Sequence, residues 1–192
     1  MPLKIFFCAL LFCLLSLTLT GRSPATEPRQ KAFIKELTAT TSATHILLFG
    51  TLENSFNPEM IDTLHSGIPL KFSFFVELYR KAEKWPGEQV LVRNFQHILT
   101  YDTLKDNYRI TLEEDNNRIV SYKSLTEAEK VINEINGARV VQLNQLLPDN
   151  TYKLKIRAEL HQKTLPLSLH NVLPFLSWWD VETDWQSIEF KF

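Results

Sequence analysis

The side chains best suited to binding are concentrated near the C-terminus, in the run Trp178-Trp179-Asp180-Val181-Glu182-Thr183-Asp184-Trp185. Tryptophan rings stack on sugars or pack against partner proteins, and carboxylates accept hydrogen bonds or hold cations. This composition favours a ligand-binding or partner-binding surface, and its predicted residues are Trp178, Trp179, Asp180, Asp184 and Trp185. The alternative is a structural role, in which the tryptophans pack into one end of the fold and the acidic residues lie on a turn.

The five histidines offer little for catalysis or metal binding. No two have the i,i+4 spacing of a helical zinc motif, and no His-x-His occurs. His97, on an expected long strand, is the histidine that would face a cleft. A histidine in such a position is more often a hydrogen-bonded residue of the sheet. The nucleophile-elbow, phosphate-loop and dinucleotide motifs are absent as well. We therefore predict no catalytic residue, no metal site and no cofactor; a hydrolase using His97 or the C-terminal acids is the least favoured alternative.

Residues 1–25 have the pattern of a signal peptide. Lys4 precedes an uncharged apolar run over residues 5–19, which is shorter than the ~20 residues of a membrane-spanning helix. Ser23 and Ala25 place small residues at the −3 and −1 positions of a cleavage site after Ala25. The alternative is an uncleaved anchor formed by residues 5–19. The sequence thus predicts an exported protein of the periplasm or cell envelope that meets the membrane only through this segment.

Cysteine content and charge exclude further classes of function. Both cysteines, Cys8 and Cys13, lie inside the signal segment, so the mature chain has no disulfide, thiol catalyst or thiolate metal site. Removing residues 1–25 removes Lys4 and Arg22 and no acids. The 21 Lys and Arg residues then fall to 19 against 22 Asp and Glu residues, a net charge of −3. With no cluster of basic residues to displace counterions, we predict no nucleic-acid binding.

Most of the elements that must position these side chains are strands. Residues 26–32 form a polar linker, and residues 33–192 form one β-rich domain. Residues 70–79 alternate large apolar with mainly polar side chains and are expected to form the central strand of the sheet. Residues 152–161 show the cleanest alternation. The remaining expected strands cover residues 33–40, 44–52, 90–101, 108–112, 118–122, 138–143 and 186–192, with a bulge near Arg93 and Asn94 in the fourth strand along the chain.

Two short helices interrupt the strands. Asn57 is a good N-cap, Pro58 suits the first helical position, and Gly67 supplies a left-handed stop. A second helix begins near Ser124, and we expect Gly137 to end it. Its apolar face consists of Leu125, Ala128, Val131, Ile132 and Ile135. The predicted fold is an antiparallel β-sandwich of about 8–9 strands with two short helices.

Several segments form a distinctive combination: Tyr101-Asp102-Thr103-Leu104 and residues 66–70, 76–80, 108–111, 124–128, 148–157 and 180–185, which span nearly all of the mature chain. Together they resemble a bacterial domain-of-unknown-function family, number 4390, whose members are exported proteins of similar length. The resemblance implies a β-rich periplasmic or envelope protein and carries over no catalytic residue or cofactor. Some family members are encoded beside a membrane sensor kinase, which implies an envelope or membrane protein as partner.

The function expected from these observations is a non-enzymatic protein-interaction module in the cell envelope. The alternative is a carbohydrate- or lipid-binding module that uses Trp178, Trp179 and Trp185.

Overall fold

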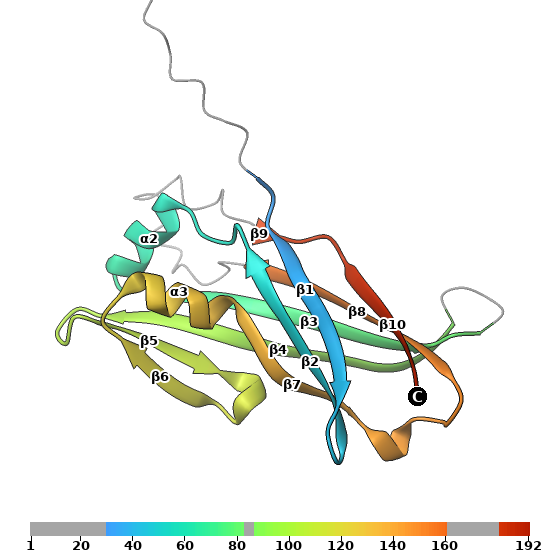
Figure 1. The fold of residues 1–192 in the computed structure, drawn as a ribbon. Coiled ribbons are helices and arrows are strands. Elements are labelled where there is room, and N and C mark those ends of the chain that lie inside the picture. Colours follow the sequence, from blue (N-terminus) through green and yellow to red (C-terminus); the bar gives the residue numbers. More distant parts are fainter. Residues whose placement is uncertain (1–29, 83–86, 161–180) are drawn as a thin grey trace, which may run out of the picture. The chain divides into compact units, whose positions relative to one another are not determined.

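Ten strands and two α-helices make up most of residues 30–82, 87–160 and 181–192, which are the residues described by the computed structural model (Figure 1). The helices are α2 (Pro58–His65) and α3 (Leu125–Asn133), and two 3-10 turns are η1 (Glu113–Asp115) and η2 (Leu143–Gln145). The strands are β1 (Phe33–Thr41), β2 (His45–Glu53), β3 (Leu70–Arg80), β4 (Glu88–Asp102), β5 (Asn107–Leu112), β6 (Arg118–Tyr122), β7 (Glu134–Gln142), β8 (Thr151–Leu160), β9 (Val181–Glu182) and β10 (Gln186–Lys191).

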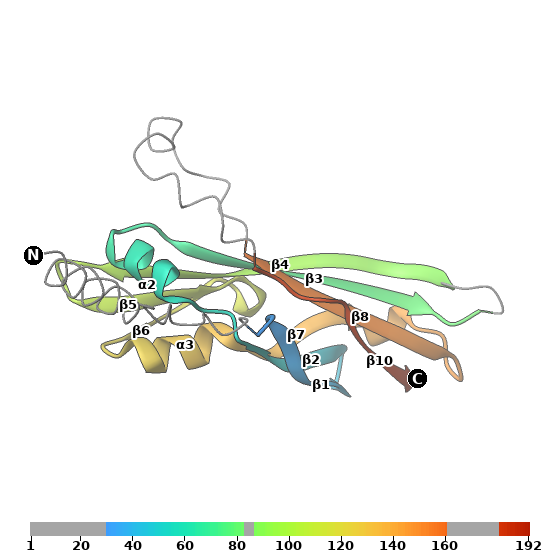
Figure 2. The same ribbon diagram turned by 90° about the horizontal axis from the view of Figure 1, so that it is seen from above.

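Two antiparallel sheets form the layers of the domain. The large sheet has the order β10-β8-β3-β4-β5-β6, with β9 also paired to β8, and the small sheet has the order β1-β2-β7. The small sheet and α3 lie along one side of the large sheet (Figure 2). The predicted antiparallel, sandwich-like β fold with two helices is therefore confirmed, with ten strands in the described residues rather than eight or nine.

Strand β3 is the central strand of the core, as its sequence pattern predicts. It pairs with β4 on one side and β8 on the other. Its inward side chains are each at most 2% exposed, and burial of each contributes about 1.5–3 kcal/mol before entropy. They are Leu70, Phe72, Phe74, Val76 and Leu78. The side chains that alternate with them along β3 point to the opposite face of the sheet.

Helix α2 begins and ends at the expected residues. The Asn57 side chain accepts a hydrogen bond of 2.6 Å from the Met60 N–H. At the other end Gly67 has φ 85°, and the N–H of Ile68 donates to the Thr63 carbonyl. This is the pattern of a Schellman ending.

The predicted end of the second helix is wrong. Helix α3 ends at Asn133, and β7 begins at the next residue, so Ile135 lies in a strand. The Ile132 carbonyl accepts from His97, and the Asn133 side chain accepts from Ser55. These contacts come from distant parts of the chain and are not visible in the local pattern. Gly137 has φ 75° inside β7 and is the extra residue at an irregularity in its pairing with β2.

The predicted position of the bulge in the long strand is also wrong. Arg93 and Asn94 pair regularly with β3, and the register shift lies at Val90, between Leu91 and Gln89. The side chains of Phe95, His97 and Leu99 therefore share the buried face.

Neither helix in the described part of the chain is long and apolar enough to cross a membrane.

Candidate functional site

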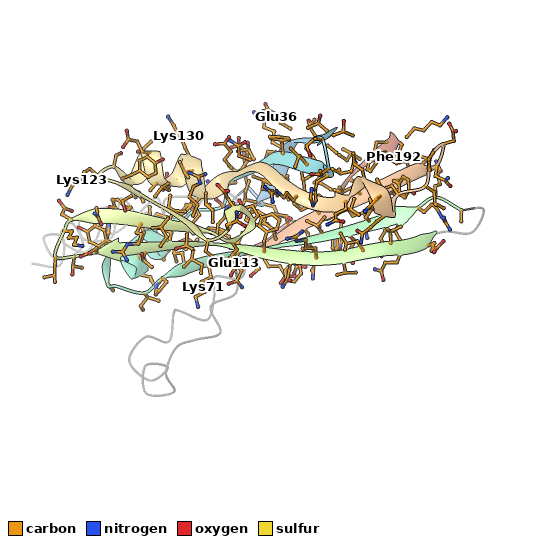
Figure 3. All side chains as sticks on the ribbon, turned by 90° about the horizontal axis from the view of Figure 1, so that it is seen from below. Glu36, Lys71, Glu113, Lys123, Lys130 and Phe192 are labelled. Atoms are coloured by element: carbon orange, nitrogen blue, oxygen red, sulfur yellow. The ribbon has the colours of Figure 1, made fainter. Side chains whose placement is uncertain are left out.

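The outward face of the large sheet carries a group of aromatic and charged side chains on β3, on β8 and just before β10. Inward residues of β8 are buried, so the alternation places Lys155 and Arg157 on the outward face. The register puts Glu77 directly opposite Lys155 and Phe75 directly opposite Arg157. Figure 3 shows the side chains as sticks on the ribbon. We call this group the Trp185 surface; it consists of Phe75, Glu77, Tyr79, Lys155, Arg157 and Trp185.

Trp185 is the most exposed ring of this surface, and it rests on two cations. The Lys155 Nζ lies 4.3 Å from the indole centroid, and the Arg157 Cζ lies 5.1 Å from it. The side chains of Lys155 and Arg157 are only 22% and 26% exposed, and such partly desolvated cation–π contacts contribute about 0.5–2 kcal/mol each. Both cations extend from the same side of β8, and 36% of Trp185 remains exposed.

A short pairing with β8 holds the Trp185 segment in place. The Thr183 N–H donates to the Ala158 carbonyl, and the Thr183 hydroxyl accepts from the Ala158 N–H. Thr183 is 3% exposed. Next to it, the Arg157 guanidinium donates to Glu182 at 2.6 Å. These bonds fix the backbone immediately before Trp185, so the ring is presented by a rigid strand pair.

The remaining members of the surface are tied together by charge. The Lys155 ammonium lies 3.0 Å from the Glu77 carboxylate, and the Tyr79 hydroxyl donates to the same carboxylate. Burial raises the pKa of Tyr79, and the hydrogen bond to Glu77 raises it further. The Arg157 Cζ lies 5.0 Å from the Phe75 centroid. Each cation therefore contacts both a carboxylate and an aromatic ring.

Exposed groups at the margin extend this surface. Asp184 is paired with Lys31 at 2.6 Å, but both side chains are mostly exposed, so the pair contributes little to stability. Val92 on β4 lies opposite Glu77 and is 59% exposed. Asp184 is thus an exposed carboxylate next to Trp185 in the chain, and Val92 is an exposed apolar side chain on the same face as Glu77.

The structure places two of the five predicted site residues on or beside this surface, Trp185 and Asp184. Trp178, Trp179 and Asp180 lie outside the described residues. The sequence did not indicate that Lys155, Arg157 or the β3 residues belong to this surface. The alternation of residues 152–161 did mark Lys155 and Arg157 as outward-facing, but nothing in it paired them with Phe75, Glu77 or a distant tryptophan.

His97 is a core residue whose two ring nitrogens both have hydrogen-bond partners, which is the role that the sequence favours for it. It is fully buried, its Nδ1 lies 2.6 Å from the Ile132 carbonyl oxygen, and its Nε2 lies 2.9 Å from Glu114 Oε1. A carbonyl oxygen can only accept, so Nδ1 carries a hydrogen. Nothing in the sequence pattern indicated Glu114.

A separate groove of about 400 Å³ lies between β2 and α3. Half-buried Glu129 lines it, and burial raises the pKa of this carboxyl above its ordinary value. The other lining residues are Thr51, Leu52, Glu53, Thr126, Lys130, Asn133 and Glu134. Within the described ranges, His, Cys, Asp and Glu side chains do not form any group of three able to hold a metal ion.

Comparison with known proteins gives one match. Neither the curated proteins nor the solved structures contain a significant match to this chain. The sequence matches a family described as a domain of unknown function over residues 29–189, a range that includes the Trp185 surface and all of both sheets except the last two residues of β10. The match confirms the resemblance seen in the sequence, and the chain belongs to the DUF4390 family.

Proposed function

We propose that this protein is a non-enzymatic binding module that recognises another protein through the Trp185 surface. The observation that carries the proposal is the partly exposed Trp185 ring, fixed on Lys155 and Arg157. Trp, Tyr and Arg are the residues most enriched at energetic hot spots of protein interfaces. The side chains are already ordered by mutual contacts, so binding costs little conformational entropy.

The shape of the surface favours a protein over a small molecule. Small ligands bind mainly in concave pockets, whereas the Trp185 surface is the outward side of a sheet. Protein interfaces commonly combine a central aromatic cluster with a polar, charged rim. Here Trp185 and Phe75 supply the aromatic part, and Asp184 lies at the rim.

The exposed groups indicate the chemistry of the partner. The exposed part of the indole ring attracts a cation, and the carboxylates of Asp184 and Glu182 are 79% and 56% exposed. Val92 offers an apolar contact on the same face. The complementary partner is therefore a protein that presents an arginine or lysine next to an apolar side chain.

The proposed place of action is the cell envelope. The apolar run over residues 5–19, preceded by Lys4, supports export. The partner would then be an envelope or membrane protein.

Site-specific crosslinking in intact cells tests the proposal. A photo-crosslinking residue at Ser187, which follows the surface on β10, should give a discrete protein adduct. The same residue at Thr40, an exposed position on β1 in the small sheet, is the matched control and should not give it. Trp185→Ala should abolish the adduct, and Asp184→Asn should weaken it. An adduct that also forms from Thr40, or that survives Trp185→Ala, would contradict the proposal.

The second candidate function is carbohydrate or lipid binding, and the observation in its favour is the same partly exposed indole ring, since tryptophan rings stack on sugars. Titration of the full chain with envelope glycans and phospholipid vesicles, followed by tryptophan fluorescence, distinguishes the two. A saturable change that is lost in Trp185→Phe would favour this candidate. An unchanged signal alongside a Trp185-dependent crosslink would favour the protein partner.

A further inference from the structure

The junction between α3 and β7 combines a helical sequence pattern with a strand conformation. We propose that residues 134–137 form a helix–strand switch, in which they either extend β7, as in this structure, or add a last turn to α3. The contact of His97 with the Ile132 carbonyl holds the strand form. This inference does not depend on the Trp185 surface.

The sequence of the segment suits a helix. Ile135 continues the apolar face formed by Leu125, Ala128, Val131 and Ile132, and Gly137 stands where a helix would place its left-handed ending residue. In the structure Ile135 is instead buried from a strand, at 1% exposure. The same side chain can therefore be buried in either conformation.

The backbone of the segment is compatible with both forms. Helix α3 passes into β7 with no connecting residue, and the Glu134 N–H still donates to the Val131 carbonyl as in a final helical turn. Gly137 already has φ 75°, which both a bulge and a helix ending require. Only three residues, 134–136, would have to leave their partners on β2, which are Thr51, Gly50 and Phe49.

His97 competes directly with the hydrogen bond that would add the turn. In an α-helix the Ile132 carbonyl accepts from the N–H of residue 136. Here that carbonyl accepts from His97 Nδ1 at 2.6 Å. A buried carbonyl needs a donor, and the two donors give two discrete alternatives. Glu114 keeps the imidazole in place by contacting its other nitrogen.

The switch would expose part of the backbone of β2. In the helical form residues 49–51 of β2 lose their partner strand beside the groove of about 400 Å³, which Thr51 and Glu134 both line. The exposed backbone there would accept an extended strand from another chain.

The test compares backbone conformation in variants of the full chain. In the wild type, NMR Cα shifts of residues 134–136 should be strand-like. The double variant His97→Leu/Glu114→Leu removes the competing donor and leaves an apolar core. Its residues 134–136 should move to helical shifts while residues 138–142 keep strand shifts. The control is Leu99→Ala, which opens a cavity on the same face of β4 without freeing the Ile132 carbonyl, and it should leave residues 134–136 strand-like.

A surface pair keeps the test decisive if the double variant does not fold. Asn136 is exposed, so Asn136→Ala and Asn136→Val leave the core intact while favouring helix and strand respectively. The Cα shifts of Glu134 and Ile135 should be measurably more helical in the alanine variant than in the valine variant. Identical shifts in the two variants would overturn the proposal, as would strand-like or disordered residues 134–136 in a folded double variant.

Discussion

The Nε2 atom of His97 lies 2.9 Å from Glu114 Oε1, and both side chains are enclosed by the core, at 0% and 6% exposure. The second oxygen of Glu114 is buried and has no hydrogen-bond partner among the described residues. The pair links the long strand β4 to the turn η1, while the other imidazole nitrogen links β4 to α3. One buried polar group thus joins three elements of the fold.

Removing one member of this pair should be costly. Glu114→Ala leaves a buried imidazole nitrogen without its hydrogen-bond partner, so the free energy of unfolding should fall by about 1–3 kcal/mol. Urea denaturation followed by circular dichroism measures the change. His97→Leu/Glu114→Leu should lose much less, because an apolar pair replaces a buried polar one. Equal losses in the single and double variants would show that packing, not the polar contact, dominates.

The contact between Lys155 and Trp185 should be visible in both stability and fluorescence. Lys155→Met keeps the alkyl chain but removes the cation from the indole and from Glu77, and it should lower the free energy of unfolding by about 1–2 kcal/mol. Tryptophan emission should shift as well. The control is Lys191→Met, whose ammonium pairs with Asp149 at an exposed position and should change little. A Lys155→Met protein identical to wild type in both measurements would rule out a significant cation–π contact.

The N-cap of α2 can be tested with one substitution. Asn57→Ala removes the acceptor for the Met60 N–H and should destabilise the protein by about 0.5–2 kcal/mol. Asn57→Asp retains an acceptor and should restore most of the loss. Thermal unfolding of the three proteins compares them, and an aspartate variant as unstable as the alanine variant would contradict a capping role.

The raised pKa of Glu129 predicts a pH dependence. Burial favours the protonated carboxyl in the folded state, so its contribution to stability is present below the unfolded-state pKa and is lost as pH rises through the folded-state pKa. Glu129→Gln should therefore raise the melting temperature near neutral pH, and the difference should vanish in acid. Melting curves from about pH 3 to pH 8 measure this. Glu127→Gln on the exposed side of α3 is the control, and a Glu129→Gln difference that persists in acid would contradict the assignment.

The sequence by itself determined the elements whose patterns are local. The alternation along residues 70–79 and 152–161 identified β3 and β8, because strand geometry sends successive side chains to opposite faces. Asn57, Pro58 and Gly67 bounded α2, because cap residues act on backbone groups within a few positions. The antiparallel sandwich-like fold followed from these elements.

Only the tertiary structure decided the end of α3 and the composition of the Trp185 surface. The donor that replaces a helical hydrogen bond at Ile132 comes from His97, 35 residues away in the chain. Trp185 meets Lys155 and Arg157 only because β10 pairs with β8 in one particular register. Strand register and long-range hydrogen-bond partners depend on how the whole chain packs, so local patterns do not specify them.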